Sequence, residues 1–326
     1  SAASDVYKRQ PVYLRKRASG TESMVVDGGF QLQVRQDADK YPSIPECKVV
    51  DTHNMTAALN GYGNGYTYFL DRPMQATTKS VYNILSGDAD HYSEFFSLCN
   101  NTDFTEEVLT KVGFIDEKME ANKKTAELKK YRIFTNAGVH PAQNEKLVRF
   151  FSNYRYTIYA PTNAAIQDAY SKGLMNIDDI EEFVYSNLDA DGNLSEENKQ
   201  KAQAMITMLV NFVKYHFQDQ MFFVDNVNNE GKYQTSCIDN IGNVYLSIRM
   251  KQSPGAMTLT DNDNQVVNVV EPYNMMARDA DFDSNVTATA TGIDGSSYVA
   301  IHQVDKVLNF FNLNGGRYDC LLYTSD

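Results

Sequence analysis

The sequence predicts an α+β fold in which helices come first and short strands follow. Between residues 80 and 217, most apolar residues recur at steps of three and four, the spacing that places them on one face of a helix. From about residue 221 onward, short apolar stretches alternate with turns rich in Gly, Asp and Asn. Because the two patterns occupy separate parts of the chain, the alternating strand–helix order of parallel α/β folds is not expected.

The composition is that of an acidic chain with enough apolar residues for a sizeable core. The chain has 326 residues, of which 42% are hydrophobic, and its formal net charge is −12. No apolar stretch approaches the roughly 20 residues that a membrane helix requires. A phosphate backbone calls for a basic face. We therefore expect no nucleic-acid partner and no direct membrane span in this chain.

The sequence carries no motif for a metal, a nucleotide or a catalytic nucleophile. Four cysteines lie far apart, without the close pairs of a structural zinc site; they are Cys47, Cys99, Cys237 and Cys320. A Walker loop, a GxSxG elbow and an HExxH helix are all missing from the sequence. We therefore expect no cofactor and no enzymatic activity.

The first helical region is predicted to hold several short helices. Residues 80–98 have helical spacing that is interrupted near Gly87-Asp88, which predicts two helices. Residues 104–109 form a short amphipathic pattern, for which the polar residues 101–103 offer a cap. Residues 116–149 are charge-rich and lack a clear period, which is typical of an exposed segment.

The stretch of residues 156–165 predicts a strand that turns directly into a helix. It begins with alternating aromatic and β-branched residues, which favour a strand. Pro161 stops the ladder because it has no N–H to donate. Thr162 or Asn163 can then cap the helix by accepting a bond from a free N–H one turn later.

One long helix and several strands are predicted after this corner. Residues 176–186 read as a short acidic helix, and residues 199–217 place Ala, Met, Ile, Leu, Phe and Val on one helical face. The clearest strands beyond them cover residues 221–224, 244–250, 266–270 and 285–291.

Three segments together resemble the motifs of the fasciclin domain family. Residues 156–165 resemble its first signature box, a strand that runs into Ala-Pro-x-Asn-x-Ala and a helix. Residues 209–217 resemble its helix that ends in a Tyr-His pair, and residues 298–308 resemble its closing strand, which runs into Asp-Lys-Val-Leu. The resemblance implies a wedge-shaped β-sandwich with helices along one side. It also implies structural roles for Thr157, Ala160, Pro161, Asn163, Ala165 and Asp305. It further implies that residues 116–149 are a surface insertion, because the family places there a strand that enters the signature box.

An internal repeat predicts two such domains, of which the first is incomplete. Residues 65–74 repeat the ending found at 298–308, namely an apolar strand followed by Asp and a basic residue. We interpret residues 11–78 as the C-terminal half of a first fasciclin-like domain and residues 79–313 as a complete second one. Two terminal stretches are expected to be wholly or partly non-native, residues 1–10 and the tail 314–326.

The Tyr-His pair and one acidic turn are the candidate binding residues. His216 ends an apolar stripe, so it is interpreted either as a general base or ligand or as a buried core histidine. In some family members the neighbourhood of this pair is linked to integrin binding, which makes Tyr215 and His216 candidates for partner contact. Asp189, Asp191 and Asn193 match the first positions of a calcium loop, but Leu194 and Gln200 break the template. A capping turn is the alternative interpretation.

The resemblance points to a non-enzymatic adhesion or binding module. We expect an extracellular, cell-surface or periplasm-facing protein, secreted or lipid-anchored and similar to bacterial members of the family. Its expected partners are an extracellular protein or glycan and neighbouring fasciclin-like domains. The alternatives are an enzyme that acts on a polysaccharide through two loop carboxylates, and a module that responds weakly to calcium.

Overall fold

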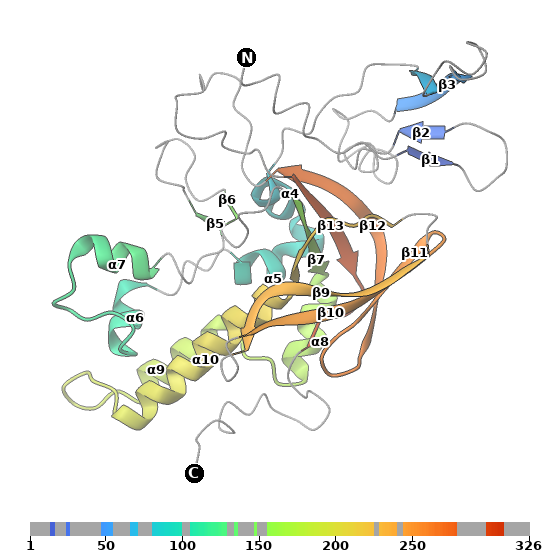
Figure 1. The fold of residues 1–326 in the computed structure, drawn as a ribbon. Helices are drawn as coiled ribbons and strands as arrows, with labels where there is room; N and C mark the ends of the chain where they lie inside the picture. The colour runs from blue at the N-terminus through green and yellow to red at the C-terminus, as the bar shows by residue number, and fades with distance from the viewer. Residues whose placement is uncertain are drawn as a thin grey trace.

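The structure of the chain is a computed structural model (Figure 1). It describes residues 14–16, 24–26, 47–54, 66–70, 80–99, 105–128, 134–135, 147–148, 155–224, 228–239, 244–278 and 298–309.

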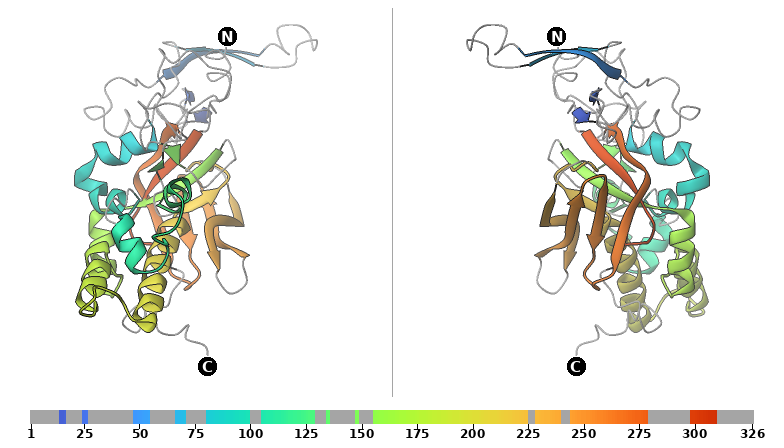
Figure 2. Two further views of the ribbon diagram at one scale, coloured as in Figure 1. Left: turned by 90° about the vertical axis from the view of Figure 1, so that its left-hand side faces the viewer. Right: turned by 90° about the vertical axis from the view of Figure 1, so that its right-hand side faces the viewer.

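Seven strands close into a mixed β-barrel, and the helices lie beside it (Figures 1 and 2). The order around the barrel is β10-β11-β12-β13-β7-β8-β9. Neighbouring strands are antiparallel except β13 and β7, which run parallel and pair Tyr298 with Arg155 at one end and Val304 with Pro161 at the other. The strands are β7 (Arg155–Pro161), β8 (Phe217–Asp219), β9 (Asn229–Asp239), β10 (Val244–Ser253), β11 (Ala256–Thr260), β12 (Val266–Arg278) and β13 (Tyr298–Val304).

The expected fold, a wedge-shaped β-sandwich with helices along one side, is wrong, because the sheet closes into a barrel. The closing element is β7, which precedes the other barrel strands in the sequence and is inserted between β13 and β8. It thereby covers two strands that would otherwise be sheet edges. Strands of sandwiches and barrels have the same two-residue alternation, so the sequence pattern could not distinguish the two arrangements.

Seven helices are described: α4 (Val81–Gly87), α5 (Ala89–Cys99), α6 (Glu106–Lys111), α7 (Ala121–Leu128), α8 (Asn163–Ser171), α9 (Ile177–Ser186) and α10 (Glu196–Tyr215). The predicted break near Gly87-Asp88 and the predicted long helix are confirmed. The cap of α6 is Thr105, whose hydroxyl accepts a bond from Val108, and not a residue of 101–103. Part of the predicted insertion forms α7, a helix without buried residues.

Two hydrophobic cores lie on opposite faces of β7. Tyr156, Ile158 and Ala160 pack against the helices, in what we call the helix-side core. Tyr159 points the other way, into what we call the barrel core, which also holds Leu308 and residues of β10, β11 and β12. Because both faces of β7 are covered, six consecutive residues of this strand are buried, and polar residues do not alternate with apolar ones.

The remaining strands form two further sheets. β1 (Leu14–Lys16), β2 (Met24–Val26), β3 (Cys47–Asn54) and β4 (Tyr66–Leu70) form an antiparallel sheet in chain order, and β5 (Phe134–Thr135) pairs with β6 (Leu147–Val148). The division into domains at 11–78 and 79–313 stays a prediction. Three predictions concern residues outside the described ones: the strand at 285–291 and the stretches 1–10 and 314–326.

No described helix is both long and apolar enough to cross a membrane.

Candidate functional site

His216 contacts all three segments that were singled out in the sequence, namely residues 156–165, 209–217 and 298–308. It follows α10 directly, and its ring Nδ1 lies 2.9 Å from the carbonyl oxygen of Phe212. Its Nε2 accepts a hydrogen bond of 2.9 Å from the backbone N–H of Leu308, after β13. Its own carbonyl accepts a bond of 2.9 Å from the backbone N–H of Tyr159 in β7. One residue therefore links the end of α10 to β7 and to the segment after β13.

These bonds define the protonation state of the His216 ring. Since Leu308 donates to Nε2, this nitrogen carries no hydrogen, and Nδ1 carries the one that is donated to Phe212. The residue is fully buried, and burial lowers the pKa of His216 to about 4, against the opposing effect of the bond to Phe212. At neutral pH the ring is uncharged, with both nitrogens engaged in bonds to the backbone.

Tyr215, the other member of the pair, belongs to the barrel core. Its side chain is buried, and its hydroxyl donates a bond of 3.2 Å to the carbonyl of Ser247 in β10. Both side chains of the pair are therefore enclosed in the folded chain. A role for Tyr215 and His216 in partner contact stays a prediction, and the contacts described here are structural ones.

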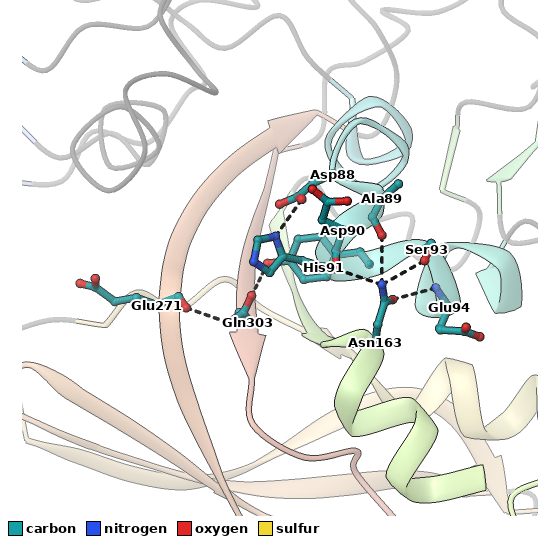
Figure 3. Close-up of polar contacts among 10 residues, drawn as sticks. Asp88, Ala89, Asp90, His91, Ser93, Glu94, Asn163, Glu271 and Gln303 are labelled. Carbon is teal, nitrogen blue, oxygen red and sulfur yellow. Dashed lines mark hydrogen bonds and ion pairs between the residues drawn. The ribbon is translucent and has the colours of Figure 1, made fainter.

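Asn163, the first residue of α8, joins this helix to α5 (Figure 3). Its Nδ2 donates to the carbonyls of Ala89 and Asp90 and to the hydroxyl of Ser93, at 3.0 to 3.1 Å. Its Oδ1 accepts a bond of 2.9 Å from the backbone N–H of Glu94. The start of α8 is thus fastened to the first turns of α5, and the cap of α8 itself is Thr162.

The other predicted motif residues also lie at junctions between elements. Thr157 donates through its hydroxyl to the carbonyl of Gln220 and accepts from the N–H of Phe222. Asp305 accepts two bonds from Asn268 in β12, at 2.8 and 2.7 Å. Ala160 and Ala165 are buried beside the helices, and Pro161 is the last residue of β7.

Sequence reasoning missed a second buried histidine, His302 in β13. Its Nδ1 accepts a bond of 2.9 Å from the backbone N–H of Asn274, and its Nε2 lies 2.8 Å from the carbonyl oxygen of Phe222. Burial lowers the pKa of His302 to about 4 as well. The sequence signal for it was the position of a histidine within an apolar strand. His302 lies two residues before Val304, so the two side chains are on the same face of β13, the face toward the barrel core.

The predicted acidic turn is a tight backbone turn before α10. Oδ1 of Asp189 accepts bonds of 2.9 Å from the backbone N–H groups of both Asp191 and Asn193. The backbone N–H of Asp189 donates to the carbonyl of Asn193. Within the part of the chain that the structure describes, no three His, Cys, Asp or Glu side chains are placed to hold a metal.

Asp261 has the property expected of a catalytic acid but the contacts of a structural residue. Burial raises its pKa. Its two oxygens accept four bonds of 2.8 to 3.0 Å, from the backbone N–H groups of Asp263, Gln265 and Asn309 and from the Gln265 amide. These bonds fasten the turn between β11 and β12 to the segment after β13. We therefore interpret the Asp261 carboxyl as a structural group that fixes the backbone of these two segments.

The chain matches no protein-family model and no curated protein.

Proposed function

We propose that this chain is a non-enzymatic, extracellular binding module of the fasciclin type, which adheres to a protein or glycan at a cell surface. The observation that carries the proposal is the set of bonds around His216. The three segments that resemble the family's motifs meet at this residue, and its ring is engaged at both nitrogens. The polar groups of the motifs hold the fold together, which leaves the outer surface for recognition.

A few large apolar side chains on that surface are suited to contact a partner. Tyr185 in α9 is 44% exposed, and Val244 and Tyr245 at the start of β10 are 60% and 50% exposed. Tyrosine is favoured at interfaces because one end of the side chain is apolar and the other forms hydrogen bonds. We infer that one of these two tyrosines contributes to recognition.

The location and the other partners follow from the same resemblance. As a fasciclin-like module, the protein works outside the cytoplasm, at the cell surface or facing the periplasm. Neighbouring domains of the same kind are its partners within the parent chain.

The test is binding of the full chain to arrays of glycans and of extracellular matrix proteins. We expect saturable binding to at least one class without release of products. Tyr185→Ala and Tyr245→Ala form a matched pair, since each removes one exposed tyrosine from a different element. We expect one of them to weaken binding at least fivefold. Release of shortened glycans would favour the polysaccharide-acting enzyme and would contradict the proposal.

A further inference from the structure

Residues 220–224, which we call the strap, leave the barrel wall between β8 and β9. The apolar run 221–224 has the composition of a strand, and a strand was expected there, but the structure gives it no regular secondary structure. Gln220, at its start, has a φ of 70°, a left-handed conformation that is uncommon for a residue other than glycine. The chain therefore turns out of β8 at this point.

Side chains from four different strands hold the strap. Thr157 of β7 bonds to the backbone of Gln220 and Phe222, at 2.9 and 3.1 Å. Gln252 of β10 donates to the carbonyl of Phe223 at 2.6 Å. Two further strands contribute the residues His302 and Asn274. Since β10 lies across the barrel from β7 and β13 in the strand order, the strap spans the barrel from one wall to the other.

Apolar side chains of the strap close the barrel core. Val224 is 2% exposed and belongs to that core. Phe222 packs against it and lies with its ring centroid 4.5 Å from that of Tyr233 in β9. If the strap moved outward, these apolar side chains and the part of the barrel core beneath them would be exposed to water.

His302 and Asn274 form one continuous chain of contacts to the strap. The His302 ring bonds to the Phe222 carbonyl through Nε2 and to the Asn274 N–H through Nδ1. The Asn274 side chain in turn accepts from the N–H of Val224 at 2.7 Å and donates to its carbonyl at 2.9 Å. Asn274 sits in an irregular stretch of β12 with a φ of 56°. The two residues together hold both Phe222 and Val224.

This arrangement requires an uncharged His302 ring. Nδ1 must be without hydrogen in order to accept from Asn274. A proton added there would set two donors, the ring N–H and the Asn274 N–H, against each other at 2.9 Å. Three titratable groups lie beside the ring and the strap. Tyr159 of β7 has its ring 6.1 Å from that of His302, Tyr233 of β9 packs against Phe222, and Asp219 of β8 accepts from the N–H of Gln220 at 2.9 Å. Both nitrogens of the His302 ring bond to backbone groups, so the ring is not paired with a carboxylate.

We propose that the strap is an acid-released cover of the barrel core, with His302 as its latch. A proton taken from solvent onto Nδ1 removes the acceptor of the Asn274 N–H and turns Asn274 away. Val224 then loses both bonds to the Asn274 side chain. The charged ring still donates through Nε2 to the Phe222 carbonyl, so the strap swings out together with the ring as the charge reaches water. The proton leaves again when the pH rises, and the cover closes.

The strap is expected to open before the rest of the fold. His216 has the same kind of neutral ring, but its partners Phe212 and Leu308 belong to α10 and the barrel core, so its protonation loosens the whole fold. The strap is not part of either neighbouring strand. Segments of this kind open at lower free energy than the elements around them. Two buried histidines should therefore produce two separable acid transitions.

The absence of tryptophan from the chain allows a direct test. Phe222→Trp places a single tryptophan on the strap, and its emission is followed from pH 7.5 to 3.5 beside the far-ultraviolet circular dichroism of the helices. We expect the emission to shift to the red within the window between about pH 6.5 and 4, at a higher pH than the loss of helical signal.

Two variants in the same background identify the latch. His302→Gln keeps a donor near the Phe222 carbonyl but cannot titrate. We expect it to abolish the separate strap transition, either by retaining the closed emission until the helices unfold or by showing the open emission already at pH 7.5. The matched control His216→Gln should retain the separate strap transition. A strap transition that persists unchanged in His302→Gln, or that coincides with helix loss in the parent chain, would overturn the proposal.

Hydrogen exchange provides the same test without any substitution, in case Phe222→Trp does not fold. Peptides that cover residues 218–224 are compared with peptides of α10 in the unmodified chain, with rates corrected for the intrinsic effect of pH. We expect the strap to lose protection at a higher pH than α10. Simultaneous loss in both would overturn the proposal.

Discussion

The two cores on either side of β7 are stabilised in different ways. The helix-side core is a large cluster of buried apolar residues, with Phe95 and Phe212 fully enclosed. The barrel core is smaller and is bordered by buried polar residues that bond to backbone, chiefly His302 and Asn274. His216 lies between the two cores, with its ring against Phe95 and Phe212 and its Nε2 bonded to Leu308. The stability of the helix-side core depends mainly on the apolar groups that are removed from water. The stability of the barrel core depends in addition on directed hydrogen bonds.

The two cores should therefore respond differently to a loss of side-chain volume and to a change of pH. A packed apolar cluster is sensitive to lost volume and insensitive to pH. Buried neutral histidines are sensitive to pH, because acid must charge them in a place where water cannot solvate the charge. The following predictions test this contrast. The single substitutions come first, in order of decreasing effect at neutral pH, and the dependence on pH and on calcium follows.

The largest effect is expected from a cavity in the helix-side core. Phe212→Ala removes a fully buried ring and should lower the free energy of unfolding by about 3–5 kcal/mol. Urea unfolding followed by circular dichroism measures the change. Tyr185→Ala on α9 is the control, because the residue is 44% exposed and the loss should be about 0.5 kcal/mol or less. Similar losses for the two variants would show that this side does not depend on buried volume.

The next effect concerns His216. His216→Ala leaves the N–H of Leu308 and the carbonyl of Phe212 without their bonds to the ring, and should cost about 1–3 kcal/mol. Binding of a partner by chains that remain folded should be unchanged, since the ring is buried. The melting temperature is the measurement. An unaltered melting temperature would mean that this ring does not hold the three segments together.

The loss of stability between pH 6.5 and 4 should come mainly from the two buried histidines, His216 and His302. An exposed histidine takes up its proton near pH 6.5, whereas the folded pKa values of His216 and His302 are about 4. In this window the unfolded chain binds more protons, so the free energy of unfolding falls with falling pH, by about 1.4 kcal/mol per pH unit for each ring. Asp261, whose pKa is raised, opposes the trend at the lower end.

Urea titrations at several pH values measure this slope. The double variant His216→Gln, His302→Gln should lose most of the decline between pH 6.5 and 4, whatever its stability at neutral pH. If the slope were the same in the double variant, the decline would have to come from other groups.

The smallest effect is expected at the acidic turn. Calcium should leave the melting temperature unchanged, because Oδ1 of Asp189 already accepts two backbone N–H groups. Thermal unfolding with calcium and with a chelator measures this. A rise in melting temperature that is absent in Asp189→Ala would instead support the calcium-responsive alternative.

The sequence predicted local structure better than the way in which segments meet. The helix that ends at Tyr215 was recognised because its apolar face repeats every three to four residues, a signal contained within the segment itself. The closure of the barrel by β7 depends on pairing with β13, more than a hundred residues later, and no local pattern encodes it. The fold class was wrong for that reason.

The same distinction applies to the site. His216 attracted attention because it ends an apolar stripe, yet its partner Leu308 lies 92 residues away and was not foreseeable. His302 was overlooked within its strand. The apolar composition of the run 221–224 predicts a strand. Its actual conformation depends on side chains of Thr157, Gln252 and Asn274, which come from three other strands.

The account rests on His216 as a buried, neutral junction of three segments, and nitrogen NMR of the histidine rings tests this most directly. With the His216 signal assigned by comparison with His216→Gln, long-range ¹H–¹⁵N spectra report which nitrogen carries the hydrogen and at what pH the ring titrates. We expect the Nδ1–H form at pH 7 and no titration above about pH 5. An Nε2–H form, or titration near pH 6.5, would contradict the account.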